Sequence, residues 1–187
     1  MGQRPPRDAV ENADWQCAVV FRGNTVANNR ARGVLFTTPK KIVCEDNFFD
    51  HVSGSAILLA GDAQGWYESG ACEDLVIRRN RFRDCLTSVF QYCDALISMH
   101  PEVKDLRAQK RRYHRNVLIE DNEIETFDVP LLYALSAENV TWRNNGVKRH
   151  DRYRSWGKKP FEAVGSENVV IDDPIAKGDV RPKPAAR

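Results

Sequence analysis

Strong charge of one sign and long apolar runs are both missing from this chain of 187 residues. It has 28 Lys and Arg against 26 Asp and Glu, so its formal net charge is +2. Such a balance creates no strong field and gives no argument for a nucleic-acid partner. The longest apolar runs, such as residues 56–60, are far shorter than the roughly 20 residues of a membrane span. We therefore expect one globular domain that neither binds nucleic acid nor spans a membrane.

Targeting and redox signals are also sparse. The first 16 residues contain no apolar segment, so no secretory signal is recognised there. The compartment is therefore unknown, and it would be secreted or periplasmic if an upstream segment carried an export signal. The sequence has no CxxC pair, and its odd number of cysteines cannot complete a disulfide framework: Cys17, Cys44, Cys72, Cys85 and Cys93. We expect buried free thiols, no metal site and no cofactor.

One pattern recurs five times along the chain. It is an Asn with apolar residues five and three positions before it and two positions after it, at Asn24, Asn47, Asn80, Asn122 and Asn145. Alternating apolar residues indicate a strand with one buried face, and a polar pair before each Asn interrupts it. We therefore expect strand, turn and strand in each copy, with the Asn supplying the left-handed backbone of the turn. Stacked copies would then join their Asn amides in a ladder.

A further apolar strand follows the first four Asn at a distance of about nine residues, at residues 34–36, 56–59, 89–90 and 131–133. One such unit cannot bury its own apolar face, whereas stacking at about 4.8 Å closes a continuous core. The sequence thus predicts an all-β fold, a right-handed parallel β-helix of the pectin-lyase-like type with about five to six rungs. A β-sandwich and a leucine-rich horseshoe are the alternatives. Helical periodicity and a leucine framework are both nearly absent.

The repeat also predicts the domain organisation. An irregular segment (1–16) is expected before the β-helix domain (17–176), and a disordered basic tail (177–187) after it. A sixth copy begins at Val169, but Pro174 takes the place of its Asn. The first copy has full strength and no amphipathic cap, so we expect the solenoid to be incomplete at its N-terminal end.

Two insertions interrupt the regular spacing. Successive Asn lie 23, 33, 42 and 23 residues apart, which places extra residues at 61–73 and at about 93–116. Insertions into a repeat usually form loops on one face, often the binding face. We expect the functional site where these two loops lie on adjacent rungs.

The first insertion contains Asp62, Trp66, Tyr67 and Glu68 among glycines. This is the composition of a sugar site, in which aromatic rings face the C–H surface of the sugar and carboxylates bind its hydroxyls. The alternative is a solvated loop whose Trp66 packs on the solenoid. The second insertion has a charged middle, residues 104–112, that is expected to be a solvated excursion or a short helix.

His100 and Glu102 differ from that charged middle because they directly follow an apolar strand, residues 95–97, that would hold them. A glycoside hydrolase needs two carboxylic acids flanking the scissile bond. Asp62 and Glu102 can form such a pair from neighbouring rungs, and burial beside an aromatic ring would raise the pKa of the acid.

Two arginines and two histidines outside the insertions were also considered. Arg30 or Arg32 could reach the same groove from the preceding rung and donate to sugar hydroxyls or to a carboxylate. The alternative is a turn with exposed arginines. His51 and His150 are interpreted as ordinary loop histidines.

Six segments together resemble one known family: NRARGVLFTTPKK, SGSAILLAGDAQGWYESG, DLVIRRNRF, ISMHPEV, RRYHRNVLIEDNEIETFD and PLLYALSAENVTWRNN. They are similar, over about residues 17–147, to the C-terminal part of the catalytic β-helix of glycoside hydrolase family 110, the α-1,3-galactosidases. The resemblance implies an exo-acting, inverting, metal-independent hydrolase that removes terminal α-1,3-linked galactose. It implies that the acidic residues Asp62, Glu68 and Glu102 are catalytic, without saying which is the general acid and which is the general base. It also implies a galactose subsite lined by Arg32, Trp66, Tyr67, His100 and His114.

Two other function classes stay open. One is a non-catalytic carbohydrate-binding or structural β-helix, whose partner would again be a glycan with terminal α-galactose if it binds sugar. The other is a polysaccharide lyase or another β-helix hydrolase. A lyase would be expected to place basic residues and calcium-binding carboxylates in the groove, whereas acids and aromatics dominate the first insertion.

Overall fold

The computed structural model describes residues 10–68, 70–88, 92–104 and 106–172. These residues form parallel β-sheets together with two short 3₁₀ turns, η1 (Ala13–Trp15) and η2 (Leu106–Ala108). No helix among them has the length and apolar character needed to cross a membrane. The predicted tail at 177–187 and the expected strand at 89–90 lie outside the described residues, as does most of the predicted N-terminal segment.

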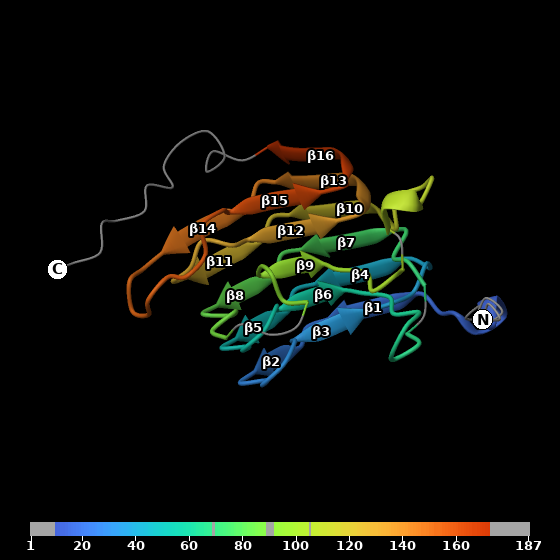
Figure 1. The fold of residues 1–187 in the computed structure, drawn as a ribbon. Coiled ribbons are helices and arrows are strands. Elements are labelled where there is room, and N and C mark those ends of the chain that lie inside the picture. The colour runs from blue at the N-terminus through green and yellow to red at the C-terminus, as the bar shows by residue number, and fades with distance from the viewer. Residues whose placement is uncertain (1–9, 69, 89–91, 105, 173–187) are drawn as a thin grey trace.

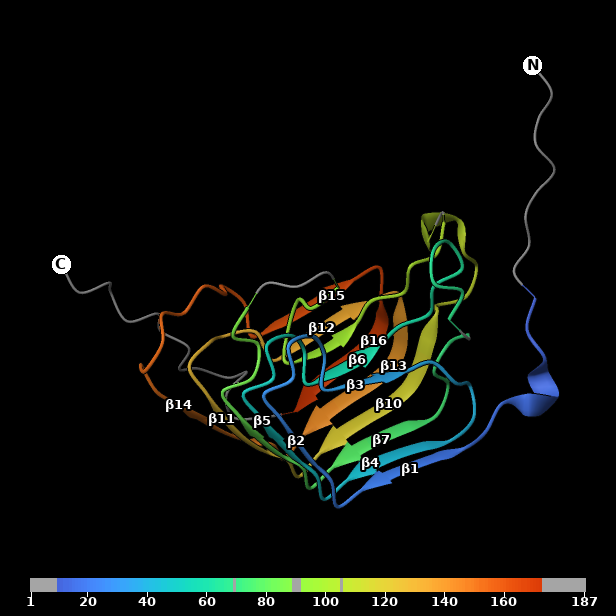
Figure 2. The same cartoon turned by 90° about the horizontal axis from the view of Figure 1, so that it is seen from below.

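Three sheets wrap around one core (Figures 1 and 2). The first contains, in spatial order, β1 (Val19–Arg22), β4 (Ile42–Glu45), β7 (Leu75–Arg78), β10 (His114–Glu120), β13 (Ala137–Arg143) and β16 (Glu167–Asp172). The second contains β2 (Thr25–Ala27), β5 (Phe48–Asp50), β8 (Arg81–Arg83), β11 (Glu123–Thr126) and β14 (Gly146–Arg149). The third contains β3 (Val34–Phe36), β6 (Ile57–Leu59), β9 (Ile97–Met99), β12 (Leu132–Leu135) and β15 (Phe161–Val164).

The order of strands follows the course of the chain. Each neighbouring pair within a sheet is parallel, and the chain visits the first, second and third sheet in turn before it returns to the first. Each coil therefore lies on the previous one, as in a parallel β-helix. The expected all-β fold with parallel stacking is confirmed, and the strand expected at the sixth copy is β16.

Inward-pointing side chains alternate with outward-pointing ones along the strands. In the first sheet, Ile42, Cys44, Leu75 and Ile77 are fully buried. The position two residues after each Asn forms a second column, in which the rings of Phe49 and Phe82 stack with centroids 5.1 Å apart. Burial of such apolar columns is the main stabilising contribution to folding. The described cysteines are free thiols, and four of them are buried as expected, whereas Cys17 is exposed.

The predicted asparagine ladder is present. Each Asn donates from Nδ2 to the Oδ1 of the Asn in the next coil, at 3.0 Å (Asn24 to Asn47), 2.9 Å (Asn47 to Asn80), 3.1 Å (Asn80 to Asn122) and 2.8 Å (Asn122 to Asn145). The same Oδ1 atoms also accept the backbone N–H of the preceding Asn. The last four amides are almost fully buried. The ladder thus satisfies, inside the core, polar groups that would be costly to bury alone.

The turn at each Asn differs from the prediction. The left-handed residue is the one before the Asn: Gly23 (φ 68°), Asp46 (φ 58°), Arg79 (φ 51°), Asp121 (φ 54°) and Asn144 (φ 52°). The reason is geometric, because the preceding residue makes the bend and the Asn can then direct its amide inward. A left-handed backbone is unfavourable for Arg79, whose guanidinium is held by Asp46 of the previous coil, with Nε 2.9 Å from Oδ1.

The second insertion was predicted as one loop, but the structure differs. It is divided between two corners of the solenoid, because β9 (Ile97–Met99) takes the place in the third sheet expected for residues 89–90. Residues 84–96 lie between β8 and β9, and residues 100–113 lie between β9 and β10. The strand expected at residues 95–97 therefore begins two residues later than predicted. The short 3₁₀ turn η2 confirms the short-helix alternative for the charged middle of this insertion.

The ladder gives the first testable prediction. Replacing Asn80 by Ala leaves the buried backbone N–H of Asn47 and the carbonyl of Cys44 without their partners. We expect Asn80→Ala to lower the free energy of unfolding by about 3 kcal/mol, since buried unsatisfied groups cost about 1–3 kcal/mol each. Urea denaturation measures the change. Asn24→Ala is the matched control at the exposed end of the ladder, and equal losses in the two variants would contradict a stabilising ladder.

Candidate active site

Two loops that follow the third sheet form one assembly on the outside of the solenoid. The first connects β6 to β7 and the second connects β9 to β10, and they project together from the same corner (Figure 2). Asp62 and Glu102 form an isolated parallel β-bridge between them. The Glu102 N–H donates to the Gly61 carbonyl at 2.8 Å, and the Ala63 N–H to the Glu102 carbonyl at 3.3 Å. The expectation that both loops emerge side by side is confirmed.

Asp62 organises the first loop. Its carboxylate accepts the backbone N–H groups of Gln64 at 2.6 Å, Gly65 at 2.7 Å and Trp66 at 2.9 Å. Burial opposes its charge, but these three donors outweigh burial and hold the pKa of Asp62 below its ordinary value. Asp62 is therefore an ionised carboxylate whose oxygens are already engaged by the loop.

Glu68 has the opposite electrostatic character. Burial raises its pKa, the nearby positive charge of Arg32 lowers it, and the negative charge of Asp62 raises it again. The net effect is a raised pKa, which favours the protonated form required of a general acid. The Nε of Arg32 is buried and has no hydrogen-bond partner among the described residues. Arg32 is therefore close enough to Glu68 for its charge to act on that carboxyl group, whereas Arg30 is exposed.

Glu102 lies next to an imidazole with its own carboxylate partner. His100 Nδ1 is 2.7 Å from Asp94 Oδ2, and His100 Nε2 is 3.9 Å from Glu102 Oε1. The His100 ring also contacts two tyrosines, with centroids 4.9 Å from Tyr92 and 5.7 Å from Tyr133. These contacts fix the orientation of His100 toward Glu102. Sequence reasoning missed Asp94 and both tyrosines, because they come from segments that approach only in the folded chain.

The aromatic pair of the first loop is open to solvent. The side chain of Trp66 is 79% exposed and that of Tyr67 is 67% exposed. The alternative in which Trp66 packs on the solenoid is therefore wrong. Tyr67 has a left-handed backbone (φ 54°), an unfavourable conformation for a non-glycine residue, and such strain is concentrated at functional sites.

Tyr113 is a further residue that sequence reasoning did not select. Its ring packs so closely on Gly61 that a Cβ there would lie 2.2 Å from the phenol oxygen. Burial raises the pKa of Tyr113 to about 12, and the charges of Asp62 and Glu68 act in the same direction. The phenol therefore keeps its proton at neutral pH and remains a hydrogen-bond donor beside the carboxylates.

His114 occupies the interior instead of the loop surface. Its side chain has no exposed area, and its Nδ1 accepts the Cys72 N–H at 3.2 Å. Burial lowers the pKa of His114 to about 3, so the ring is neutral. A side chain with no exposed area cannot contact a sugar in this structure, and we leave His114 out of the proposed site.

The two histidines interpreted as ordinary loop residues have a buried partner. Asp84 is completely buried, with His150 Nε2 2.7 Å from its Oδ1 and His51 Nε2 3.7 Å from its Oδ2. Arg152 approaches the same carboxylate at 3.6 Å. Both histidines lie in loops as expected, and their contact with a buried carboxylate was not predicted from the sequence. In the described residues, no three His, Cys, Asp or Glu side chains are grouped as metal ligands would be.

The electrostatics of Glu68 can be tested directly. Arg32→Gln removes the positive charge that lowers the Glu68 pKa, so we expect that pKa to rise further. A ¹³C NMR titration of the glutamate carboxyl carbons measures it, with Arg30→Gln as the matched control. An unchanged or lower Glu68 pKa in Arg32→Gln would contradict the placement of Arg32 beside Glu68.

Comparison with known proteins gives consistent relatives. The chain is 59% identical over 166 residues to an α-1,3-galactosidase B of Akkermansia muciniphila, which covers 89% of this chain and 21% of the relative. It is 49% identical over 170 residues to an α-1,3-galactosidase B of Bacteroides fragilis, and this match covers 88% of this chain and 29% of the relative. It is 44% identical over 174 residues to an α-1,3-galactosidase B of Bacteroides thetaiotaomicron, and this match covers 91% of this chain and 28% of the relative.

No family model matches the sequence. The chain spans less than a third of the length of these curated relatives. Identities of 44–59% over about nine tenths of the chain nevertheless establish common ancestry. Over the segment that it shares with them, the chain is therefore homologous to these α-1,3-galactosidases.

Proposed function

We propose that this chain carries the hydrolytic site of an exo-acting α-1,3-galactosidase, which releases terminal galactose from glycans with inversion of configuration. The single observation that supports it is the β-bridge between Asp62 and Glu102. This bridge joins the backbones of the two loops at Asp62 and Glu102, and Glu68 is close enough to Asp62 for the Glu68 pKa to respond. Glycoside hydrolysis requires two carboxyl groups, and the bridged loops supply Glu68 from one side and Glu102 from the other.

The proposed roles follow from the environment of each carboxylate. Glu68, whose pKa is raised, is the general acid that protonates the leaving oxygen of the glycosidic bond. Glu102, which is about one third exposed beside His100, is the general base that takes a proton from the attacking water. Asp62 holds the loop in shape through its three backbone bonds. In an inverting enzyme the acid and the base stand about 6.5–9.5 Å apart, which leaves room for that water.

Substrate recognition is assigned to the remaining polar and aromatic groups. Trp66 and Tyr67 offer exposed rings for the apolar face of galactose. Arg32, His100 and the Tyr113 phenol supply hydrogen-bond donors around the carboxylates. The proposed partner is thus a glycan with a terminal α-galactose.

The finer features of the fold are proposals as well. We infer a right-handed solenoid of about five to six rungs that extends over residues 17–176. The preference of parallel connections for right-handed crossovers supports the handedness.

Two amide variants test the acid and the base. We expect Glu68→Gln and Glu102→Gln each to lower kcat/KM toward an α-1,3-galactosyl disaccharide by about 10²–10⁴-fold, the usual contribution of general acid–base catalysis. Activity of the unaltered protein should fall as pH rises through the raised pKa of Glu68, because the acid then loses its proton. Glu123→Gln is the matched control, since Glu123 is exposed on β11. Full activity in both active-site variants would exclude these roles.

The stereochemistry is tested in the same reaction. Proton NMR of the first galactose released should detect the β-anomer, which then equilibrates. Initial release of the α-anomer would contradict inversion. Saturable binding without any release would favour a carbohydrate-binding module, for which the exposed pair Trp66 and Tyr67 is the supporting feature.

A further inference from the structure

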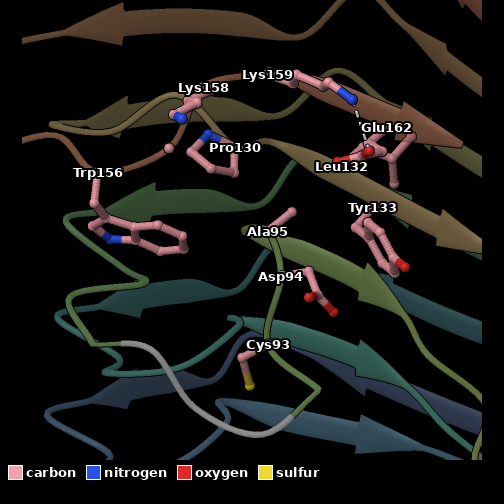
Figure 3. A pocket seen from close by; sticks show the side chains of 11 residues that line it. Cys93, Asp94, Ala95, Pro130, Leu132, Tyr133, Trp156, Lys158, Lys159 and Glu162 are labelled. Carbon is pink, nitrogen blue, oxygen red and sulfur yellow. Dashed lines mark hydrogen bonds and ion pairs between the residues drawn. The ribbon is translucent and has the colours of Figure 1, made fainter.

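A groove lies on the outside of the third sheet, next to the loops of the candidate active site. It has a volume of about 380 Å³, and its walls are residues 93–95, the start of β12 and the segment 156–159. In Figure 3, Trp156 lies at one end and Tyr133 at the other, with Asp94 between them and Lys158 above. Volumes of about 300–1,000 Å³ are typical of small-molecule sites. None of the roles assigned so far uses this groove.

Hydrogen bonds anchor the backbone at the tryptophan of the groove. The buried Asp128 carboxylate accepts the backbone N–H of Trp156 at 3.2 Å, the N–H of Gly157 at 2.9 Å and the Ser155 hydroxyl at 2.6 Å. Gly157 packs so closely on Pro130 that a Cβ would lie 2.2 Å from the proline ring. The indole is nevertheless 40% exposed. A buried carboxylate thus fixes a loop that presents an indole to the groove, and preorganisation of this kind favours ligand binding.

The groove continues into the candidate active site. Two of its lining residues, Asp94 and Tyr133, are the partners of His100, at 2.7 Å between side-chain atoms and 5.7 Å between ring centroids. His100 in turn lies 3.9 Å from Glu102. The backbone of Asp94 is anchored to the sheet, since its N–H donates to the buried Ser98 hydroxyl at 3.1 Å. A ligand with one end at Glu102 and a few rings in length would therefore extend along His100 into the groove.

The chemistry of the groove fits neutral sugars. Its apolar surface is provided by Trp156, Tyr133 and Pro130, while Asp94 and Lys158 supply an acceptor and a donor for hydroxyl groups. Lys159 is paired with Glu162 at 2.8 Å, so the groove contains both charges instead of a cluster of one sign. Such a mixture gives no preference for an anionic ligand.

We propose that this groove is the subsite for the sugars that follow the terminal galactose, with Trp156 stacking on the second or third ring of the glycan. The inference rests on the proposed function for the position of the galactose at Glu68 and Glu102. It adds a specificity site, in which the length of the glycan on the reducing side determines affinity.

Calorimetric titration tests the groove with two probes: an α-1,3-galactosyl disaccharide, and the same disaccharide extended at its reducing end by two neutral hexoses. We expect the unaltered chain to bind the longer sugar roughly tenfold more tightly, which corresponds to about 1.4 kcal/mol. Trp156→Ala should abolish this gain, and Trp156→Phe should keep part of it. Tyr153→Ala is the matched control, because Tyr153 is an exposed aromatic of the same loop that packs on Phe127 outside the groove. Thermal melts confirm that each variant is folded.

The outcomes separate this inference from the proposed function. Equal affinities for the two probes, or equal losses in Trp156→Ala and Tyr153→Ala, would overturn the groove as a subsite, while NMR detection of galactose release would still support hydrolysis. A gain that depends on Trp156 without any galactose release would support the groove and overturn hydrolysis. If the chain bound neither probe, both proposals would be wrong.

Discussion

The buried column of asparagine amides is the interaction on which the rest of the structure depends. Each amide joins its own coil to the next, so that Asn47, Asn80 and Asn122 satisfy both one another and the backbone of neighbouring coils. A slip of one residue would turn the apolar face of a strand outward and separate the amides. The ladder lies in the turns between the first and second sheets, and it therefore fixes the register of the whole stack, including the third sheet, which these turns do not adjoin. The asparagine ladder thus both holds the coils together and positions the loops.

Fixed register explains how loops 40 residues apart in sequence meet at one site. The strands β6 and β9 are in register, and the chains that leave them continue in parallel as far as Asp62 and Glu102. The two loops then differ in electrostatics. One contains an ionised Asp62 bound by backbone N–H groups and a Glu68 with a raised pKa, while the other presents Glu102 beside an oriented imidazole. The stacked coils thus bring loops with unlike carboxylates to one corner of the solenoid, which is the arrangement that the proposed acid–base chemistry would use.

Structural features that follow from the sequence repeat were predictable, whereas contacts made by the loops at the corners of the solenoid were not. The five Asn, the alternating apolar residues and the loop at Asp62 follow a repeat visible in the chain, so the sheets, the ladder and the paired loops were expected. The left-handed residue falls on Arg79 and not on Asn80 because inward orientation of the amide constrains the Asn. The contact of Asp94 with His100, the packing of Tyr113 on Gly61 and the burial of His114 depend on how a corner folds back. No periodic signal encodes these contacts. The contacts of His51 and His150 with Asp84 were not predicted for the same reason, since Asp84 reaches them only in three dimensions.

The central claim is that stacking of adjacent coils creates one galactoside site from two loops. The most direct measurement is a two-dimensional ¹H–¹⁵N NMR titration of the chain with an α-1,3-galactosyl disaccharide. We expect amides of residues 64–67 in the first loop and of Glu102 in the second to shift together along one saturable binding curve. Shifts confined to one loop, or located on the second sheet instead, would contradict a site shared by the two loops.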